Sequence, residues 1–225
     1  MEWIKQFQLF LFDFDGLLVN TEELHFKAYQ KMCQDRGFTL DWSFRQYCLS
    51  AHYDTATLRR AIFDALPELE AQESDWNVLY PEKKRAYLDL LASAEVTLMP
   101  GVENLLKALS EARIPACVVT HSSRSQVRPL QERFDVLQTI DHWVTRKDYG
   151  RAKPDPSCYQ TAMERLAKKG DRLIGFEDTP RGINALLGID ATPVLVTKVE
   201  YPEIPQFKNR GVNCYESLSK ISSLG

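Results

Sequence analysis

Residues 7–16 read Phe-Gln-Leu-Phe-Leu-Phe-Asp-Phe-Asp-Gly, an apolar run followed by two carboxylates and a glycine. The first six of these residues have the length and composition of a β-strand that is covered on both faces. Asp13 and Asp15 stand at the carboxyl end of this strand, and Gly16 allows the chain to turn away sharply. In open α/β sheets, ligands bind beyond the carboxyl ends of the strands, so we expect the chemistry of the protein here.

Strand-like and helix-like segments alternate along the sequence from about residue 100 onward. Apolar runs of strand length recur at 116–120, 141–145, 173–176 and 193–197. Between them, residues 102–112 and 159–167 carry apolar side chains at the spacing of a helix with one buried face. This alternation predicts an α/β fold: a doubly wound parallel sheet that forms a Rossmann-like core.

Residues 20–93 differ, because their apolar side chains keep helical spacing and no convincing strand interrupts them. The first strand needs the later strands as sheet partners, so this block is best placed as an insertion at the end of the first strand. We therefore expect two domains. Residues 1–19 and 94–225 form the Rossmann-like core, and residues 20–93 form an inserted helical domain.

The composition is that of an ordinary globular protein. Lys and Arg number 28 against 31 Asp and Glu, a formal net charge of −3, which argues against a general binder of nucleic acid or anionic membranes. The first residues lack the features of a secretory signal, and no apolar run reaches the roughly 18–20 residues of a membrane-spanning helix. Five scattered cysteines predict reduced thiols. We expect a cytoplasmic protein, monomeric or with a dimer as the alternative, that contacts neither nucleic acid nor membrane.

Two later segments carry groups that could bind phosphate. Thr120 ends the second strand and is followed by His121 and Ser122. Hydroxyl and backbone N–H groups at such a strand-to-helix turn can cradle a phosphate, although they also serve as plain helix caps. Lys153 precedes a proline, which makes it a stiffly placed positive charge, or else a solvated surface lysine.

Acidic residues recur at a third strand end, where Glu177 and Asp178 follow an apolar run. A hard cation such as Mg²⁺ is bound by few carboxylates, some waters and a substrate phosphate, and Asp13, Asp15 and Asp178 could provide the carboxylates. The first pair of aspartates could instead be only a helix cap or turn. A calcium-binding EF-hand is excluded, because its first ligand would be Leu11 and the preceding segment would have to be helical.

Taken together, these residues resemble the haloacid dehalogenase superfamily of aspartate-nucleophile phosphatases, and within it the β-phosphoglucomutase-like members. The resemblance spans essentially the whole chain and rests on four motifs in order: Asp13-Phe-Asp15-Gly16, Thr120, Lys153 and Glu177-Asp178. It implies a Mg²⁺-dependent enzyme that acts on a small phosphorylated metabolite. The helical insertion would be the mobile cap that closes over the site and selects the substrate.

The resemblance also implies catalytic roles. Asp13 would attack phosphorus and form an aspartyl-phosphate, and Asp15 would protonate the leaving alcohol and then deprotonate the attacking water. Thr120 and the backbone after it would hold the transferring phosphoryl group. Lys153 would neutralise the charge of this group and steady Asp13, although Arg151 could compete for that role.

Metal and substrate ligands follow from the same resemblance. Mg²⁺ would bind Asp13, the carbonyl of Asp15 and Asp178, with Glu177 close by or assisting. The dehalogenases of the superfamily lack the second aspartate, so Asp15 argues against halide chemistry. Thr21 and Glu22 would lie at the hinge of the cap. The candidates for substrate binding are Gly16, His25, Lys83, His121 and Ser122, of which His25 and Lys83 could equally be polar residues on the surface of the cap.

The sequence departs from the family at several positions. Asn20 stands where Asp is usual, and His121 where Asn or a smaller residue is usual. Residues 50–54 lack the arginine that grips the second phosphate in the mutase, and none follows until Arg59. The leading hypothesis is therefore a Mg²⁺-dependent phosphatase that acts on a small phosphomonoester, such as a sugar phosphate. A hexose-phosphate mutase and a non-catalytic binding protein with the same fold are the alternatives.

Overall fold

The computed structural model describes residues 1–53 and 55–223. The chain forms two compact units. Unit 1 comprises Met1–Val19 and the chain from Leu98 onward, and unit 2 comprises Asn20–Thr97.

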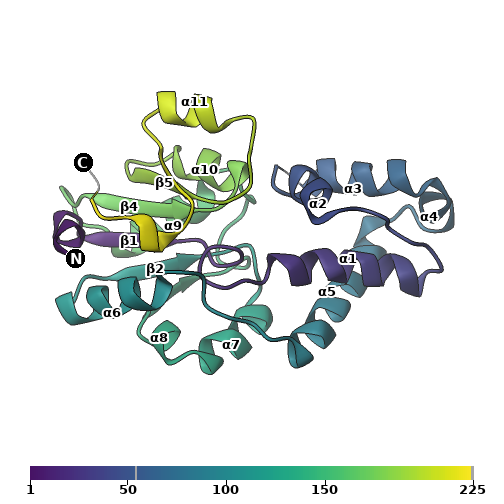
Figure 1. Cartoon of the computed structure of the whole chain (residues 1–225), viewed down its shortest axis with the longest axis horizontal. Coiled ribbons are helices and arrows are strands. Elements are labelled where there is room, and N and C mark those ends of the chain that lie inside the picture. The colour runs from purple at the N-terminus through teal and green to yellow at the C-terminus, as the bar shows by residue number, and fades with distance from the viewer. Residues whose placement is uncertain (54, 224–225) are drawn as a thin grey trace. The chain divides into compact units, whose positions relative to one another are not determined.

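Unit 1 is built on a six-stranded sheet in which every pair of neighbouring strands is parallel (Figure 1). The order of the strands is β3-β2-β1-β4-β5-β6. The first strand therefore lies inside the sheet, where it pairs with β2 on one side and β4 on the other. The strands are β1 (Leu9–Phe12), β2 (Ala116–Val119), β3 (His142–Val144), β4 (Leu173–Glu177), β5 (Thr192–Val196) and β6 (Asn213–Tyr215).

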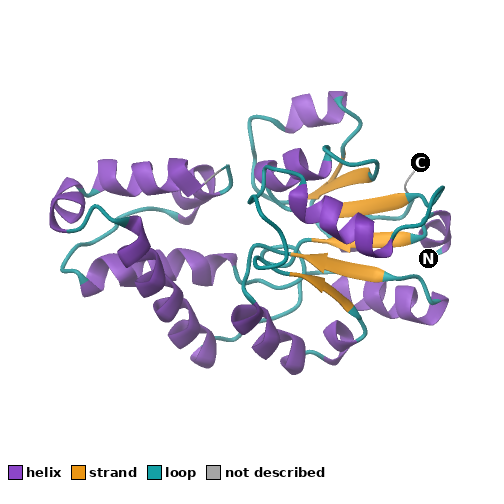
Figure 2. Ribbon diagram, turned by 180° about the vertical axis from the view of Figure 1, so that it is seen from behind, coloured by secondary structure: helices purple, strands orange, loops and turns teal. Residues whose placement is uncertain are grey.

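Helices cover both faces of this sheet, as Figure 2 shows, which confirms the predicted α/β fold. Helices α6 and α9 coincide to within two residues with the helices that the apolar spacing predicts. The helical elements of unit 1 are η1 (Glu2–Gln6), α6 (Val102–Ala112), α7 (Arg124–Arg133), α8 (Asp135–Gln138), α9 (Ser157–Leu166), α10 (Pro180–Leu186), α11 (Ile204–Asn209) and η2 (Leu218–Lys220).

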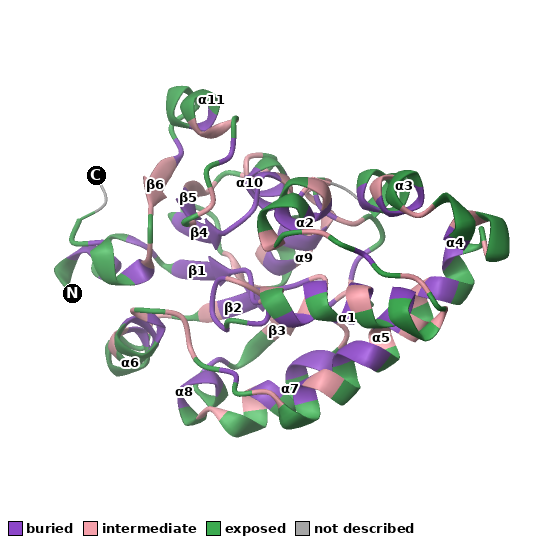
Figure 3. Ribbon diagram, turned by 45° about the vertical axis from the view of Figure 1, so that its right-hand side comes forward, coloured by how far each residue is buried: buried purple, intermediate pink, exposed green. Residues whose placement is uncertain are grey.

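Strand β1 is buried along its whole length, as the colouring of Figure 3 shows. Successive side chains of a strand point to opposite faces of the sheet. Leu9 and Leu11 pack in a cluster with side chains of α9 and α10. Phe10 and Phe12 instead join Phe176 of β4 in an aromatic group whose ring centroids are 5.0–6.1 Å apart. Burial on both faces explains why the run at residues 7–12 is continuously apolar rather than alternating.

All the regular secondary-structure elements of unit 2 within its described residues, 20–53 and 55–97, are helices. Helices α1 and α5 pack against each other, as do α2 and α3. Buried apolar side chains from several helices form its interior, among them Met32, Ile62 and Leu79. The helices are α1 (Glu22–Asp35), α2 (Phe44–Ala51), α3 (Thr55–Ala65), α4 (Pro67–Gln72) and α5 (Trp76–Ser93).

The return from unit 2 to unit 1 occurs after Thr97, four residues beyond the end of α5 at Ser93. The backbone N–H of Asn20 donates a hydrogen bond to the carbonyl of Thr97, at 3.1 Å. The side chain of Asn20 in turn accepts one from the N–H of Thr97, at 2.7 Å. These two bonds join the two chain segments at the edge of unit 2, so residues 94–97 belong with the helices.

All five cysteines are free thiols, and four of them are buried: Cys33, Cys48, Cys117 and Cys158. In the part of the chain that the structure describes, no helix combines the length and the apolarity needed to cross a membrane.

Gly101 is a position at which the fold requires glycine. Its φ is +94°, and a Cβ there would lie 2.3 Å from the backbone nitrogen of Ser219. Gly170 has a similar φ of +92° but no atom within 4 Å of such a Cβ. We expect Gly170→Ala to cost about 1–2 kcal/mol of stability through its backbone conformation alone. Gly101→Ala should cost at least about 3 kcal/mol, because the chain at Ser219 must also move. Urea unfolding would measure both losses, and equal losses would contradict the role of the close approach.

Candidate active site

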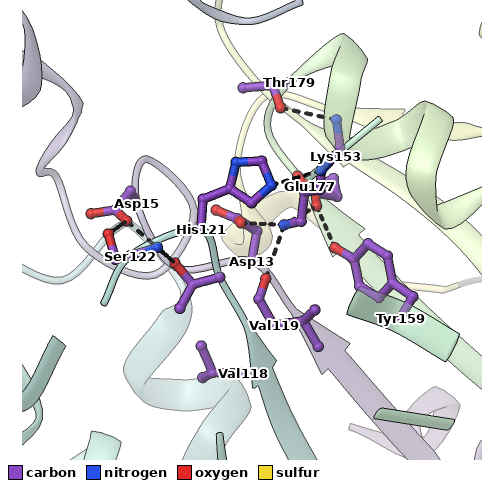
Figure 4. A network of polar contacts seen from close by, with 12 residues as sticks. Asp13, Asp15, Val118, Val119, His121, Ser122, Lys153, Tyr159, Glu177 and Thr179 are labelled. Atoms are coloured by element: carbon purple, nitrogen blue, oxygen red, sulfur yellow. Dashed lines mark hydrogen bonds and ion pairs between the residues drawn. The ribbon is translucent and has the colours of Figure 1, made fainter. Parts of the chain in front are cut away.

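The candidate active site lies at the carboxyl ends of three adjacent strands of unit 1. Asp13 directly follows β1, Thr120 directly follows β2, and Glu177 ends β4. Because these strands are neighbours and parallel, their ends meet at one edge of the sheet. Lys153 reaches the same place from the loop before α9, and Figure 4 shows its side chain next to Asp13 and Glu177.

The ammonium group of Lys153 is the centre of this site. Its Nζ lies 2.6 Å from Oδ1 of Asp13 and 2.6 Å from Oε1 of Glu177, and it donates to the carbonyl of Val119 at 2.9 Å. Two of these contacts are hydrogen bonds, to Asp13 and to Val119, and the contact with Glu177 is an ion pair. Lys153 is only 4% exposed, which means that these partners replace nearly all of its water. The guanidinium of Arg151 pairs instead with Asp155, at 3.0 Å.

Burial dominates the titration of this cluster. Desolvation raises the pKa of Asp13 from 3.8 to about 7, because the lowering by Lys153 is partly cancelled by the nearby charge of Glu177. Burial alone would lower the pKa of Lys153, but Asp13 and Glu177 outweigh it and hold that pKa well above its ordinary value. The lysine is therefore charged, and the site carries more negative charge than one lysine neutralises.

Three buried carboxylates are grouped closely enough to hold a metal ion. Asp13, Glu177 and Asp178 each offer an oxygen, and these oxygens lie within 4.8 Å of one another. Oxygen donors of this kind suit a hard divalent cation. A cation would also compensate the charge that raises the pKa of Asp13. The residues therefore fit a divalent cation such as Mg²⁺.

The carboxylate of Asp15 is held by hydroxyl groups from the turn after β2. Oγ of Ser122 donates to its Oδ2 at 2.6 Å, and Oγ1 of Thr120 lies at 3.5 Å from the same oxygen. The backbone N–H of Ser122 donates to Oγ1 of Thr120 at 2.9 Å. Gly16 follows with a φ of +82°, which turns the chain at this point. The structure thus brings together Asp15, Gly16, Thr120 and Ser122.

His121 connects the turn after β2 to the loop that carries Lys153. The backbone N–H of Lys153 donates to Nε2 of His121 at 2.7 Å. An N–H can only donate, so Nε2 must be unprotonated and the ring neutral, with its proton on Nδ1. Burial, and then the positive charges of Arg181, Lys153 and Arg146, hold the pKa of His121 well below its ordinary value. Nε2 therefore accepts from the loop, Nδ1 carries the proton, and binding of substrate by His121 stays a prediction.

Two of the predicted substrate-binding residues belong to unit 2, where they contact each other. Nζ of Lys83 lies 2.7 Å from Nδ1 of His25. Lys83 is 4% exposed and lies over the rings of Tyr29 and Tyr87, so it is not a solvated surface lysine. Glu22, the first residue of α1, contacts two further side chains of unit 2, His52 and Tyr47. Binding of substrate by His25 and Lys83 stays a prediction.

Sequence reasoning missed two groups of the site. The apolar spacing of α9 assigned Tyr159 to the core, yet its hydroxyl donates a hydrogen bond to Oε1 of Glu177. The other group is the carbonyl of Val119, which accepts from Lys153. A backbone acceptor leaves no signal in the sequence. For Tyr159 the signal was a hydroxyl on an otherwise apolar helix face, six residues after Lys153.

The comparison with known families now identifies the class of protein. The sequence model of the haloacid dehalogenase-like hydrolases matches residues 10–192. This match covers most of the chain and includes every candidate residue at the three strand ends. The chain belongs to the haloacid dehalogenase-like hydrolase family.

Relatives of this chain include enzymes named as phosphatases. The chain is 28% identical to a phosphorylated carbohydrates phosphatase of Thermotoga maritima, over 78% of each protein. It is also 28% identical to the validoxylamine A 7'-phosphate phosphatase of Streptomyces hygroscopicus, over 80% of each. A crystal structure of a family IA haloacid dehalogenase hydrolase from Entamoeba histolytica has the same fold, with a TM-score of 0.75 and 23% identity over 96% of this chain and 95% of that one.

The raised pKa of Asp13 predicts how stability depends on pH when metal is removed with EDTA. Folded Asp13 keeps its proton up to about pH 7, whereas an unfolded aspartate loses it near 3.8. Its contribution to stability is therefore full below pH 3.8 and is lost as pH rises towards 7. Asparagine does not titrate, so the Tm of Asp13→Asn should rise relative to wild type between pH 4 and 7, by several degrees. Calorimetry in EDTA would measure this, and a pH-independent difference would contradict the raised pKa.

Proposed function

We propose that this protein is a Mg²⁺-dependent phosphatase that hydrolyses a small phosphomonoester, such as a sugar phosphate, through an aspartyl-phosphate on Asp13. The observation that carries this proposal is the contact between Asp13 and Lys153. A buried carboxylate whose Oδ1 lies 2.6 Å from a fully paired ammonium is a nucleophile held in one orientation. The names of the relatives support a phosphorylated metabolite as substrate.

In the first step, a carboxylate oxygen of Asp13 attacks phosphorus, and the bond between phosphorus and the substrate's ester oxygen breaks. Asp15 gives its proton to that leaving oxygen. The hydroxyls of Thr120 and Ser122 orient the carboxyl group of Asp15. The same two hydroxyls, together with the backbone N–H groups of the turn, bind the phosphoryl oxygens. Phosphoryl transfer depends mainly on such positioning and on charge neutralisation.

In the second step, Asp15 takes a proton from a water molecule, whose oxygen attacks phosphorus. The bond between phosphorus and Asp13 then breaks, and inorganic phosphate leaves. One residue therefore acts first as an acid and then as a base. Lys153 keeps its proton throughout, because its pKa lies well above its ordinary value, so it orients Asp13 as a fixed positive charge.

Asp13, Asp178 and the carbonyl of Asp15 would hold the Mg²⁺. When bound, the ion supplies positive charge that reduces the repulsion between the carboxylates and the phosphoryl oxygens. Glu177, which the sequence placed close to the metal, is bonded to Lys153 and Tyr159 through Oε1. We therefore propose that the main role of Glu177 is to hold Lys153 in place and not to bind the metal.

Phosphate release from a panel of phosphorylated sugars and other metabolites tests the proposed function. We expect release that needs Mg²⁺, stops in EDTA and falls at least about 1000-fold in Asp13→Asn, because the amide cannot attack phosphorus. Isomerisation of β-glucose 1-phosphate in the presence of its bisphosphate, without phosphate release, would replace the phosphatase by the mutase. Inactivity in both assays would favour the non-catalytic binding protein.

Asp15→Asn separates the proton transfer from the metal site. Turnover should fall by at least about 100-fold, since an amide cannot donate or accept the proton. The affinity for Mg²⁺, measured by calorimetric titration, should stay within about twofold, because the backbone carbonyl of residue 15 is the proposed ligand. Turnover within about tenfold of wild type would refute the acid–base role of Asp15.

A further inference from the structure

The carboxylate of Glu177 is enclosed at both of its oxygens. Oε1 lies 2.6 Å from Nζ of Lys153 and accepts a hydrogen bond from the hydroxyl of Tyr159. Oε2 packs against α10, where a Cβ added to Gly182 would lie 1.8 Å from it. Glu177 is only 1% exposed. Its carboxylate is therefore fixed by the protein from two sides, and glycine at position 182 is what allows the helix so close.

Tyr159 contacts both members of the ion pair formed by Glu177 and Lys153. Its hydroxyl donates to the carboxylate, and the centroid of its ring lies 5.1 Å from Nζ of the lysine. The rest of the side chain is buried in the cluster between α9 and the sheet. The ring is thus anchored in the core, while its polar end and its face both meet charged groups of the site (Figure 4).

The hydroxyl of Tyr159 affects the position of Asp13 through Lys153. If the tyrosine hydroxyl is removed, one buried oxygen of Glu177 loses a hydrogen bond that nothing on the apolar ring replaces. The carboxylate is then free to shift, and the ammonium in contact with it at 2.6 Å shifts too, which changes its distance from Oδ1 of Asp13. Small displacements of a reacting group lower the rate without weakening the binding of the substrate.

We propose that Tyr159 is a positioning residue: it holds Glu177, which holds Lys153, which in turn orients Asp13 for attack on phosphorus. This inference rests on the proposed phosphatase function. None of the roles given above to Asp13, Asp15, Thr120 or Lys153 includes a partner on α9, so it adds a residue to the site.

The test is Tyr159→Phe, which removes the hydroxyl and keeps the ring. Measured well below the Tm of the variant, with the folded fraction checked by circular dichroism, kcat for a phosphate ester should fall about tenfold while KM stays within twofold. Competitive inhibition by inorganic phosphate should also stay within twofold, since the phosphate-binding turn is unchanged. The matched control is Tyr215→Phe, which removes a hydroxyl bonded to the carbonyl of Ser223. Tyr215 belongs to β6, the outer strand that lies two places beyond β4, and kcat and KM of this variant should equal those of wild type.

A double-mutant cycle with Glu177→Gln distinguishes positioning from a general loss of packing. If Tyr159 acts through the charge of Glu177, Tyr159→Phe should lower kcat by no more than about threefold in the Glu177→Gln background. Gly182→Ala displaces the same carboxylate from its other oxygen without touching Tyr159. It should also lower kcat at nearly constant KM, which keeps the proposal testable if the tyrosine variant does not fold.

The inference is overturned if kcat of Tyr159→Phe stays within twofold of wild type, or if this substitution changes KM instead of kcat. It is also overturned if the effects of Tyr159→Phe and Glu177→Gln on kcat multiply in the double variant. Absence of phosphate release from the wild-type protein would instead refute the proposed function itself. An active wild type with a fully active Tyr159→Phe would refute only the positioning role. The two failures are therefore distinguishable in one set of assays.

Discussion

A single buried ammonium group organises the active-site edge of the sheet. Lys153 donates hydrogen bonds to Asp13 after β1 and to the carbonyl of Val119 on β2, and it forms an ion pair with Glu177 on β4. Burying a charge is costly unless it is paired and fully hydrogen-bonded. The three strand ends must therefore lie at fixed distances from one point, and the parallel order β2-β1-β4 is the arrangement that places them there.

The same constraint explains why the site is suited to a divalent cation. Asp13, Glu177 and Asp178 lie close together, two of them against Lys153, and burial keeps water from screening their charges. The cost of burying these charges is seen in the pKa of Asp13, which burial raises to about 7. In the proposed mechanism Asp13 attacks as a carboxylate, and additional positive charge near it would favour that ionised form.

The sequence predicts the fold well because the decisive features are local. Doubly covered strands are continuously apolar, and amphipathic helices show their period, so the α/β fold was predicted and is confirmed. The carboxyl ends of the strands in a parallel sheet lie at one edge, and the sequence alone therefore predicts that Asp13, Thr120 and Glu177 are neighbours there. What the periodicity could not show are contacts that depend on exact geometry. The pairing of Asn20 with Thr97 extends unit 2 beyond the end of α5. The hydrogen bond from Lys153 to His121 and that from Tyr159 to Glu177 join residues that are 32 and 18 positions apart.

The central place of β1 also bears on how the chain folds as the ribosome makes it. The helical unit is continuous in sequence, from Asn20 to Thr97, so all of its partners have been synthesised before β2 emerges. Strand β1, by contrast, must wait for β4, whose residues follow about 160 positions later by the register Leu9 with Leu173. Local contacts form faster than contacts between distant segments. During synthesis, the most apolar strand of the protein therefore stays without one of its two neighbours until most of the chain exists, and this interval is when nascent chains are most exposed to aggregation and have most need of a chaperone.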